Sequence, residues 1–243
     1  MSKQHVLVVG ASSSIGREVI RRIAHQDMVV LAQFHTNAEA LADLARAVPA
    51  TVVPIRADLR LEADLEAMLR TIETHCPFPE KVVFLAAPRV ALIRFKDMAW
   101  SDVHARLDVE LRTAVTVCAR FLPRMAAAKL GKLVFVLSSY TLGVPPAAMA
   151  HYVTSKYALL GLMKALASEY AAKGVCVNAI SPSMVETGFL ADIPDMLVEL
   201  AADQHPLKRN ASPGDVAPMV EFLLSPAADY MTGVNVPITG GAA

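Results

Sequence analysis

Short apolar runs alternate with longer amphipathic stretches along this chain. The first run, His5–Val9, has the β-branched composition of a strand. In the stretch that follows, Ile15, Val19 and Ile23 recur at the four-residue steps of one helix face, which predicts a helix over Ile15–Ala24. The other strands that we predict are Met28–Gln33, Thr51–Arg56, Lys81–Ala86, Lys132–Ser138, Val175–Ile180 and Val234–Ile238. The other predicted helices are Ala38–Ala47, Leu61–Ile72, a long helix from about Trp100, His151–Lys173 and Asp215–Leu224.

This order predicts the fold class. Continuous apolar strands are typical of parallel sheets that are buried on both faces, and strand–helix–strand units cross over with a right hand. We therefore expect an α/β protein with one doubly wound, Rossmann-like parallel sheet of about seven strands and helices on both faces. On the long helix, Val103, Leu107, Leu111 and Val115 are expected to share one face. No linker or repeat interrupts the pattern, so residues 1–243 are expected to form a single domain.

Composition narrows the range of functions. The 54% hydrophobic content supports a large core, and 23 basic and 23 acidic residues leave no net charge for a nucleic acid or a membrane surface. The start lacks the pattern of a secretory signal, and no run reaches the roughly 18 apolar residues of a membrane span. Cys76, Cys118 and Cys176 match no metal or redox spacing. We expect a cytoplasmic protein without a metal site.

A glycine- and serine-rich turn follows the first strand. It reads Gly10-Ala11-Ser12-Ser13-Ser14-Ile15-Gly16 and opens the first helix. In a doubly wound sheet this turn directs backbone N–H groups and a helix N-terminus at a pyrophosphate, and glycine permits the close approach. The alternative is a tight strand–helix connection with serine caps.

Two further strand ends carry residues that could contact the adenine and the ribose of a dinucleotide cofactor. Asp58 follows the third strand, where its carboxylate could accept from an adenine amino group, or could cap the next helix. The second strand ends in Gln33-Phe34-His35-Thr36-Asn37, without the acidic residue that usually meets a free ribose. Ser13, Arg17, His35 and Thr36 would accommodate a 2′-phosphate there, which favours NADP(H) over NAD(H).

Candidate proton-transfer groups lie further along the chain. Tyr152 and Lys156 are four residues apart on a predicted helix, so the phenol and the ammonium share a face. A free phenol has a pKa of about 10, and a neighbouring cation favours its ionised form. Ser139 ends the preceding strand, where its hydroxyl could donate to a substrate oxygen. The alternative treats the three as a core aromatic, a solvated lysine and a strand cap.

Together these residues resemble the short-chain dehydrogenase/reductase family over the whole chain. The turn is similar to the family motif Thr-Gly-x-x-x-Gly-x-Gly, with Gly10 and Gly16 on its first and last glycines. Ser139, Tyr152 and Lys156 fall on the family's catalytic positions, and the serine-to-tyrosine gap of 13 also matches. Residues 178–187 resemble the segment that runs past the nicotinamide, and residues 230–241 resemble the C-terminal signature.

The resemblance implies reversible NAD(P)-dependent reduction of a carbonyl, in a homodimer or homotetramer. It also implies cofactor contacts beyond the glycine turn, from His35, Asp58, Leu59, Ala86, Ala87, Tyr152, Lys156, Pro182, Val185 and Thr187.

Several positions depart from the family pattern. Val9, Ser14 and Ser183 replace a threonine and two glycines, and Leu85-Ala86-Ala87-Pro88 stands where the family has Asn-Asn-Ala-Gly. The fourth catalytic residue of the family, an asparagine that holds a proton-relaying water, aligns with Glu110. A glutamate either serves this relay as an acceptor or abolishes it. These changes favour a specialised or impaired relative over an ordinary fatty-acid-type ketoreductase.

Three functions therefore stay open. The leading one is an NADP-dependent ketone reductase or alcohol dehydrogenase for a small molecule with an apolar portion, because the expected lid, Met184–Pro206, is rich in apolar residues. Arg89 and Arg94 are candidates to meet an anionic tail, or are surface residues. The second is a family member that has lost hydride transfer and acts as a binding or assembly partner. The third is lyase or isomerase chemistry in the same site.

Overall fold

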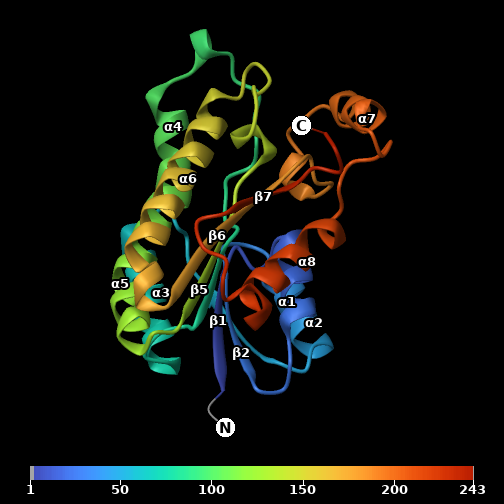
Figure 1. The fold of residues 1–243 in the computed structure, drawn as a ribbon. Helices are drawn as coiled ribbons and strands as arrows, with labels where there is room; N and C mark the ends of the chain where they lie inside the picture. Colours follow the sequence, from blue (N-terminus) through green and yellow to red (C-terminus); the bar gives the residue numbers. More distant parts are fainter. Residues whose placement is uncertain (1–2, 243) are drawn as a thin grey trace.

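A seven-stranded parallel sheet forms the centre of the computed structural model, which describes residues 3–242 (Figure 1). The strand order is β3-β2-β1-β4-β5-β6-β7. The strands are β1 (Gln4–Val9), β2 (Met28–Phe34), β3 (Thr51–Arg56), β4 (Lys81–Phe84), β5 (Gly131–Val136), β6 (Val175–Pro182) and β7 (Asn235–Ile238). The predicted fold class is confirmed.

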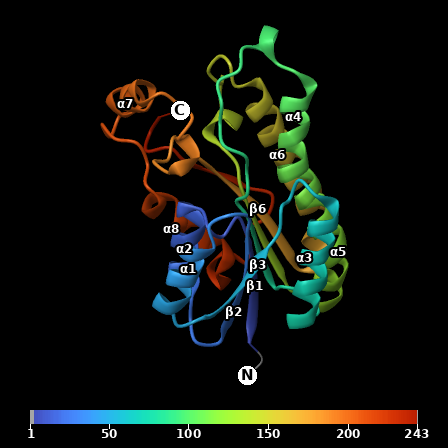
Figure 2. The ribbon, with the colours of Figure 1, turned by 180° about the vertical axis from the view of Figure 1, so that it is seen from behind.

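Helices cover both faces of the sheet (Figures 1 and 2). One face carries α1 (Ser14–Ile23), α2 (Ala38–Ala47) and α8 (Pro213–Leu224). The other carries α3 (Glu62–His75), α4 (Trp100–Leu107), α5 (Thr113–Ala128) and α6 (Ala150–Tyr170). In β1, Val6 and Val8 pack toward α1 and α2, whereas Leu7 and Val9 join the cluster on the opposite face. Burial on both faces explains why the strands are continuously apolar.

The order in which successive strands are added to the sheet reverses at β1. Strands β2 and β3 lie on one side of it and β4 to β7 on the other, so the connections leaving β1 and β4 diverge at their carboxyl ends. A crevice opens at such a switch point in doubly wound sheets. Helix α7 (Asp195–Gln204) lies beyond this end of the sheet (Figure 1). Within residues 3–242, no helix combines the length and the apolar character of a membrane span.

The prediction that Val103, Leu107, Leu111 and Val115 share one face of the long helix is wrong. A π-helical turn over Asp108–Arg112 separates α4 from α5, and its i→i+5 pattern rotates the following residues about the axis. The buried residues of this segment consequently include Arg106, Glu110 and Thr113, while Val115 is 46% exposed. The hydrophobic period alone could not reveal this turn, because two of the inward residues are charged.

The observed ends of two strands differ slightly from the predicted ones. Strand β4 ends at Phe84 rather than Ala86, because the N–H groups of Leu85 and Ala86 both bind the carbonyl of Val9. Strand β5 likewise ends at Val136, ahead of Ser138. Helix α7 was not predicted within the lid segment. It buries none of its residues fully, so it carries only a weak amphipathic pattern.

Candidate active site

One cavity of about 1070 Å³ runs along the carboxyl ends of the strands. It is lined by the glycine turn, the end of β2, the loop after β4, the segment after β5, helix α6 and the segment from Pro182 to Gln204. Among the predicted site residues, the following line it: Gly10, Ser12, Ser13, Ser14, Ile15, His35, Asp58, Leu59, Ala86, Ala87, Ser139, Tyr152, Lys156, Pro182, Val185 and Thr187. Gly16 and Glu110 lie behind this lining.

The glycine turn needs its two glycines for backbone packing. Gly10 has φ +89°, and a Cβ there would lie 2.7 Å from the backbone nitrogen of Ala86. A Cβ on Gly16 would lie 2.6 Å from the carbonyl oxygen of Gly10. The Ser13 hydroxyl accepts from the N–H of Gly16 at 3.0 Å and donates to the Gly10 carbonyl at 2.8 Å. Ser13 therefore caps the first helix, as the alternative interpretation of the turn expected. Ser12, Ser13 and Ser14 also line the cavity.

Sequence reasoning missed the part played by Gln33. This side chain is 2% exposed; its carbonyl oxygen accepts from the Gly10 N–H at 2.8 Å, and its amide donates to the Ala57 carbonyl at 3.0 Å. It joins the glycine turn to the end of β3. A glutamine inside an apolar strand was the available signal, because a buried amide must find partners.

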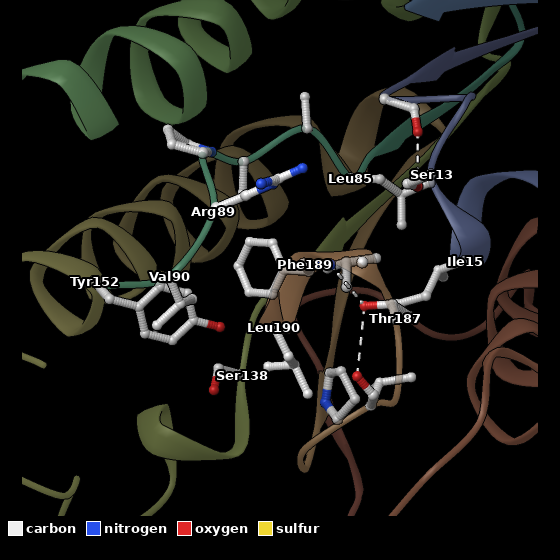
Figure 3. Close-up of a pocket in the computed structure, with 18 of the residues that line it drawn as sticks. Ser13, Ile15, Leu85, Arg89, Val90, Ser138, Tyr152, Thr187, Phe189 and Leu190 are labelled. Atoms are coloured by element: carbon white, nitrogen blue, oxygen red, sulfur yellow. Dashed lines mark hydrogen bonds between the residues drawn. The ribbon is translucent and has the colours of Figure 1, made fainter. Parts of the chain in front are cut away.

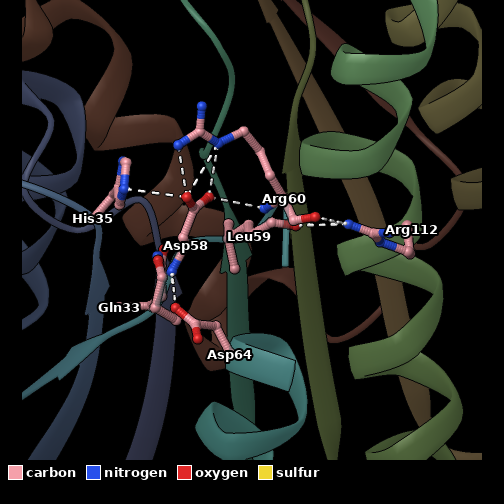
Figure 4. A network of polar contacts seen from close by, with 8 residues as sticks. Gln33, His35, Asp58, Leu59, Arg60, Asp64 and Arg112 are labelled. Carbon is pink, nitrogen blue, oxygen red and sulfur yellow. Dashed lines mark hydrogen bonds and ion pairs between the residues drawn. The ribbon is translucent and has the colours of Figure 1, made fainter. Parts of the chain in front are cut away.

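Asp58 is the centre of a polar network at the cavity edge (Figure 4). Its carboxylate accepts from Arg60 at 2.6 Å and lies 3.5 Å from the His35 ring. The hydrogen bond from Arg60 is the largest of the effects that lower the pKa of Asp58 to about 2. The helix-cap interpretation is wrong, since α3 starts at Glu62 with Leu61 before it.

Tyr152 and Lys156 lie on α6, one turn apart, at the wall of the cavity. They are 7% and 4% exposed, and Figure 3 shows the Tyr152 hydroxyl directed toward the middle of the cavity. The Lys156 ammonium lies 5.6 Å from the centre of the Tyr152 ring and donates to the Val136 carbonyl at 3.2 Å. The core-aromatic alternative accounts for the burial of the ring but not for the direction of its hydroxyl.

Two consecutive serines line the cavity after β5, where sequence reasoning singled out one. Ser139 opens the 3₁₀ turn Ser139–Thr141, and its carbonyl accepts from Leu142. Ser138 is 6% exposed, accepts from the N–H of Tyr140 at 3.3 Å, and appears among the lining residues in Figure 3. Both hydroxyl groups are therefore candidates to contact a bound molecule.

Glu110 contacts Lys156 from behind the cavity wall. Its side chain is 0% exposed, and one carboxylate oxygen forms an ion pair with the Lys156 ammonium at 2.8 Å. The other oxygen accepts from Arg106 and from the Ser155 hydroxyl, each at 3.2 Å. Glu110 thus forms a direct ion pair with Lys156, whereas the family resemblance implied a relay through a water or the loss of that relay. Arg106 was missed, although its i,i+4 spacing from Glu110 was a usable signal.

His151, the second residue of α6, is also buried, at 3% exposure. Its Nδ1 has no hydrogen-bond partner among the described residues. Burial, followed by the nearby Arg106 cation, lowers the pKa of His151. Both effects favour the neutral form of the ring.

The expected lid covers one end of the cavity. Phe189, Leu190, Ile193 and Leu197 line it, whereas Met196 is 72% exposed. Arg89 lines the cavity with its guanidinium 3.8 Å from Asp192, and Arg94 is not among the lining residues. No group of three His, Cys, Asp or Glu residues in the described part of the chain could hold a metal ion.

Comparisons with known proteins agree with this geometry. The family described as enoyl-(acyl carrier protein) reductase matches residues 10–243. The chain is 29% identical to the 3-oxoacyl-[acyl-carrier-protein] reductase FabG of Staphylococcus aureus, covering 97% of this chain and 96% of that one. It is 31% identical to the oxidoreductase UcpA of Salmonella typhimurium, with 97% and 93% covered.

A solved structure matches as well. A putative NAD(P)-dependent gluconate 5-dehydrogenase from Beutenbergia cavernae, with bound NADP, has a TM-score of 0.89 and 27% identity, with 99% of this chain and 97% of that chain covered. The chain belongs to the short-chain dehydrogenase/reductase family. It is therefore an enzyme of a family of nicotinamide-dependent oxidoreductases.

The buried His151 makes stability depend on pH. Because its pKa is lower in the folded state than in the unfolded chain, the unfolded state takes up a proton first as the pH falls below about 6.5. We expect the free energy of unfolding to fall there by up to about 1.4 kcal/mol per pH unit. Urea unfolding between pH 7.5 and 5.5 measures this slope. The slope should flatten in His151→Gln and persist in His25→Asn, which alters an exposed histidine. An equal slope in His151→Gln would contradict the assignment.

Proposed function

We propose that this chain is an NADP(H)-dependent reductase that interconverts a carbonyl and an alcohol, with Tyr152, Lys156 and Ser139 in the proton chemistry. The observation that carries the proposal is the phenol and ammonium pair of α6 at the wall of one long cavity that begins at the glycine turn.

The residues of the cavity fit a nicotinamide dinucleotide. The Nε atom of Arg17 is buried without a hydrogen-bond partner among the described residues, and Arg17 lines the cavity beside the turn. The pyrophosphate would be held by the turn, the adenine by Asp58 and Leu59, and the nicotinamide end by Ala86, Ala87, Pro182, Val185 and Thr187. When bound, the nicotinamide supplies or accepts the hydride.

The side chains of α6 handle the proton. During reduction the Tyr152 hydroxyl donates a proton to the carbonyl oxygen, and in the reverse direction it takes the proton back. The Lys156 cation favours the ionised phenol between these steps and can also hold a ribose hydroxyl. The Ser139 hydroxyl donates a hydrogen bond to the same substrate oxygen as negative charge develops on it.

The preference for NADP(H) follows from the end of β2. The residues that end β2 include no carboxylate to repel a 2′-phosphate, and His35, Thr36 and Arg17 line the cavity; the nearest carboxylate, Asp58 after β3, lies 3.5 Å from the His35 ring and is paired with Arg60. Arg60 also lines the cavity, but its guanidinium is paired with Asp58, so this pair adds hydrogen-bond donors without adding net positive charge. Cations and hydrogen-bond donors at this edge favour a phosphate over a bare hydroxyl.

The lining also indicates the class of substrate. Val90, Phe189, Leu190 and Ile193 make the end beside Tyr152 apolar, which suits a ketone, an acyl thioester or a polyketide-like carbonyl. We further propose that residues 1–243 act as one domain, in a cytoplasmic homodimer or homotetramer without a nucleic-acid partner.

Two alternatives have observations in their favour. The direct contact of Glu110 with Lys156, and Pro88 in place of a backbone donor, favour a protein that has lost hydride transfer and acts as a binding or assembly partner. The same site could also serve lyase or isomerase chemistry, which would form product without net consumption of cofactor.

Oxidation of NADPH over a panel of ketones tests the proposed reaction. We expect turnover in the wild type and a fall of about 10²- to 10⁴-fold in kcat in Tyr152→Phe, because the proton donor is removed. Binding of NADPH should persist in that variant. Tyr157→Phe, which changes a 46% exposed tyrosine on the same helix, should retain activity. Binding of neither cofactor would favour the binding partner, and product without cofactor oxidation would favour the lyase or isomerase.

Fluorescence titration with NADPH and NADH tests the cofactor preference. We expect NADPH to bind about tenfold more tightly, the worth of one hydrogen bond to a charged group. His35→Asp should reverse the preference, because a carboxylate there repels the phosphate and accepts from a ribose hydroxyl. His25→Asp makes the same charge change at an exposed position outside the cavity lining and serves as the control. Equal affinities in the wild type would refute the preference.

Alanine substitution separates the two serines. Ser139→Ala should lower kcat by about 10²- to 10³-fold, as does the loss of one donor to a developing oxyanion, with little change in KM. Ser138→Ala should stay within a few fold of the wild type. If the larger loss occurs in Ser138→Ala instead, the role belongs to Ser138.

A further inference from the structure

Behind the cavity wall, three buried charged side chains form a cluster that we call the charge triad: Arg106, Glu110 and Lys156. Glu110 lies between the two cations, 3.2 Å from the Arg106 guanidinium and 2.8 Å from the Lys156 ammonium. The exposure of the three side chains is 3%, 0% and 6% in that order. Such a group is costly to bury, and apolar residues of equal volume are often as stabilising or more so. The triad therefore calls for an explanation other than stability.

The charges of the triad act on Tyr152. The Arg106 guanidinium carbon lies 5.2 Å from the centre of the Tyr152 ring, and the Lys156 nitrogen lies 5.6 Å from it. Glu110 alone would cancel the lysine cation on which proton transfer depends. With Arg106 present, two cations and one anion leave a single net positive charge, the same as an unpaired lysine would provide.

We propose that Arg106 and Glu110 are positioning residues for proton transfer: Glu110 anchors the Lys156 ammonium, and Arg106 restores the positive charge beside Tyr152 that Glu110 removes. This inference rests on the proposed function, in which Tyr152 exchanges the proton. The π-helical turn Asp108–Arg112 contributes by directing Glu110 inward, one turn after Arg106. Arg106 is held in turn by a hydrogen bond to the Arg89 carbonyl, in the loop after β4.

Other ionisable groups surround this region and must be considered in any pH titration. From α6, His151 is buried and is influenced by Arg106, Glu110 and Asp102. From the turn after β5, the Tyr140 ring lies 6.2 Å from the Tyr152 ring, edge-on, and burial raises the pKa of Tyr140. From the loop after β4 and the lid, Arg89 and Asp192 form an ion pair at 3.8 Å. Only Arg106 and Glu110 bear a charge directly against Lys156 or the Tyr152 ring within this set.

An optical titration of the protein without cofactor tests the triad. The tyrosinate absorbance is followed against pH, and the Tyr152 component is isolated by subtracting the same titration of a matched variant that also carries Tyr152→Phe. Glu110→Gln removes the anion, so the midpoint of the Tyr152 component should move to lower pH by about one unit. Arg106→Met removes a cation, so its midpoint should move to higher pH by a similar amount.

Two further variants serve as controls. Arg106→Lys keeps the charge and should retain the wild-type midpoint, and the double variant Arg106→Met with Glu110→Gln should return close to it, because one net positive charge remains. Circular dichroism checks the fold; if Arg106→Met alone does not fold, the double variant compared with Glu110→Gln still measures the effect of the Arg106 charge. Midpoints that do not move in Glu110→Gln and Arg106→Met, or that move in the same direction in both, would overturn the proposal. If the midpoints shift as expected but the wild type shows no turnover, the proposed function is refuted and the role of the charge triad is not.

Discussion

The ion pair between Glu110 and Lys156 is the interaction on which the account of this site depends. It places a carboxylate against the lysine whose positive charge the proposed reaction needs. If this were the only ion pair there, the Glu110 carboxylate would cancel the effect of the Lys156 cation on Tyr152. Two opposite charges at short range produce little net electrostatic potential at a third group. Arg106 shares the same carboxylate and contacts the face of the Tyr152 ring, so the cluster as a whole stays cationic. A departure from the family pattern thus comes with a neighbouring compensation.

The fold supplies the framework for this cluster. Parallel strands end at one edge, and the reversal of strand order at β1 opens a cavity there. At one end of the cavity the glycine turn is hydrogen-bonded to Gln33, which joins Gly10 to the end of β3. At the other end, α6 presents Tyr152 and Lys156 from a helix that packs against α4. Both ends are therefore set by packing and buried hydrogen bonds rather than by loops alone.

The parallel sheet, its helical layers and the place of most predicted site residues in the cavity could be predicted from the sequence, because they follow from hydrophobic period and from residues at strand ends. Glu110 was also connected with the lysine by position. The sequence could not reveal the π-helical turn that rotates it inward, since a one-residue change of helical phase leaves no apolar signature. Arg106 and Gln33 were missed for a related reason: a polar residue is expected at the surface, and only tertiary contacts show that it is buried.

Transfer of isotope is the most direct test of the central claim that this cavity carries out hydride chemistry. Reduced NADP bearing deuterium at the transferable position of the nicotinamide is incubated with the protein and a ketone, and the alcohol is analysed by mass spectrometry. The account predicts an alcohol that is heavier by one deuterium, with the label lost from the oxidised cofactor. An unlabelled product, whichever face of the nicotinamide carries the deuterium, would contradict it.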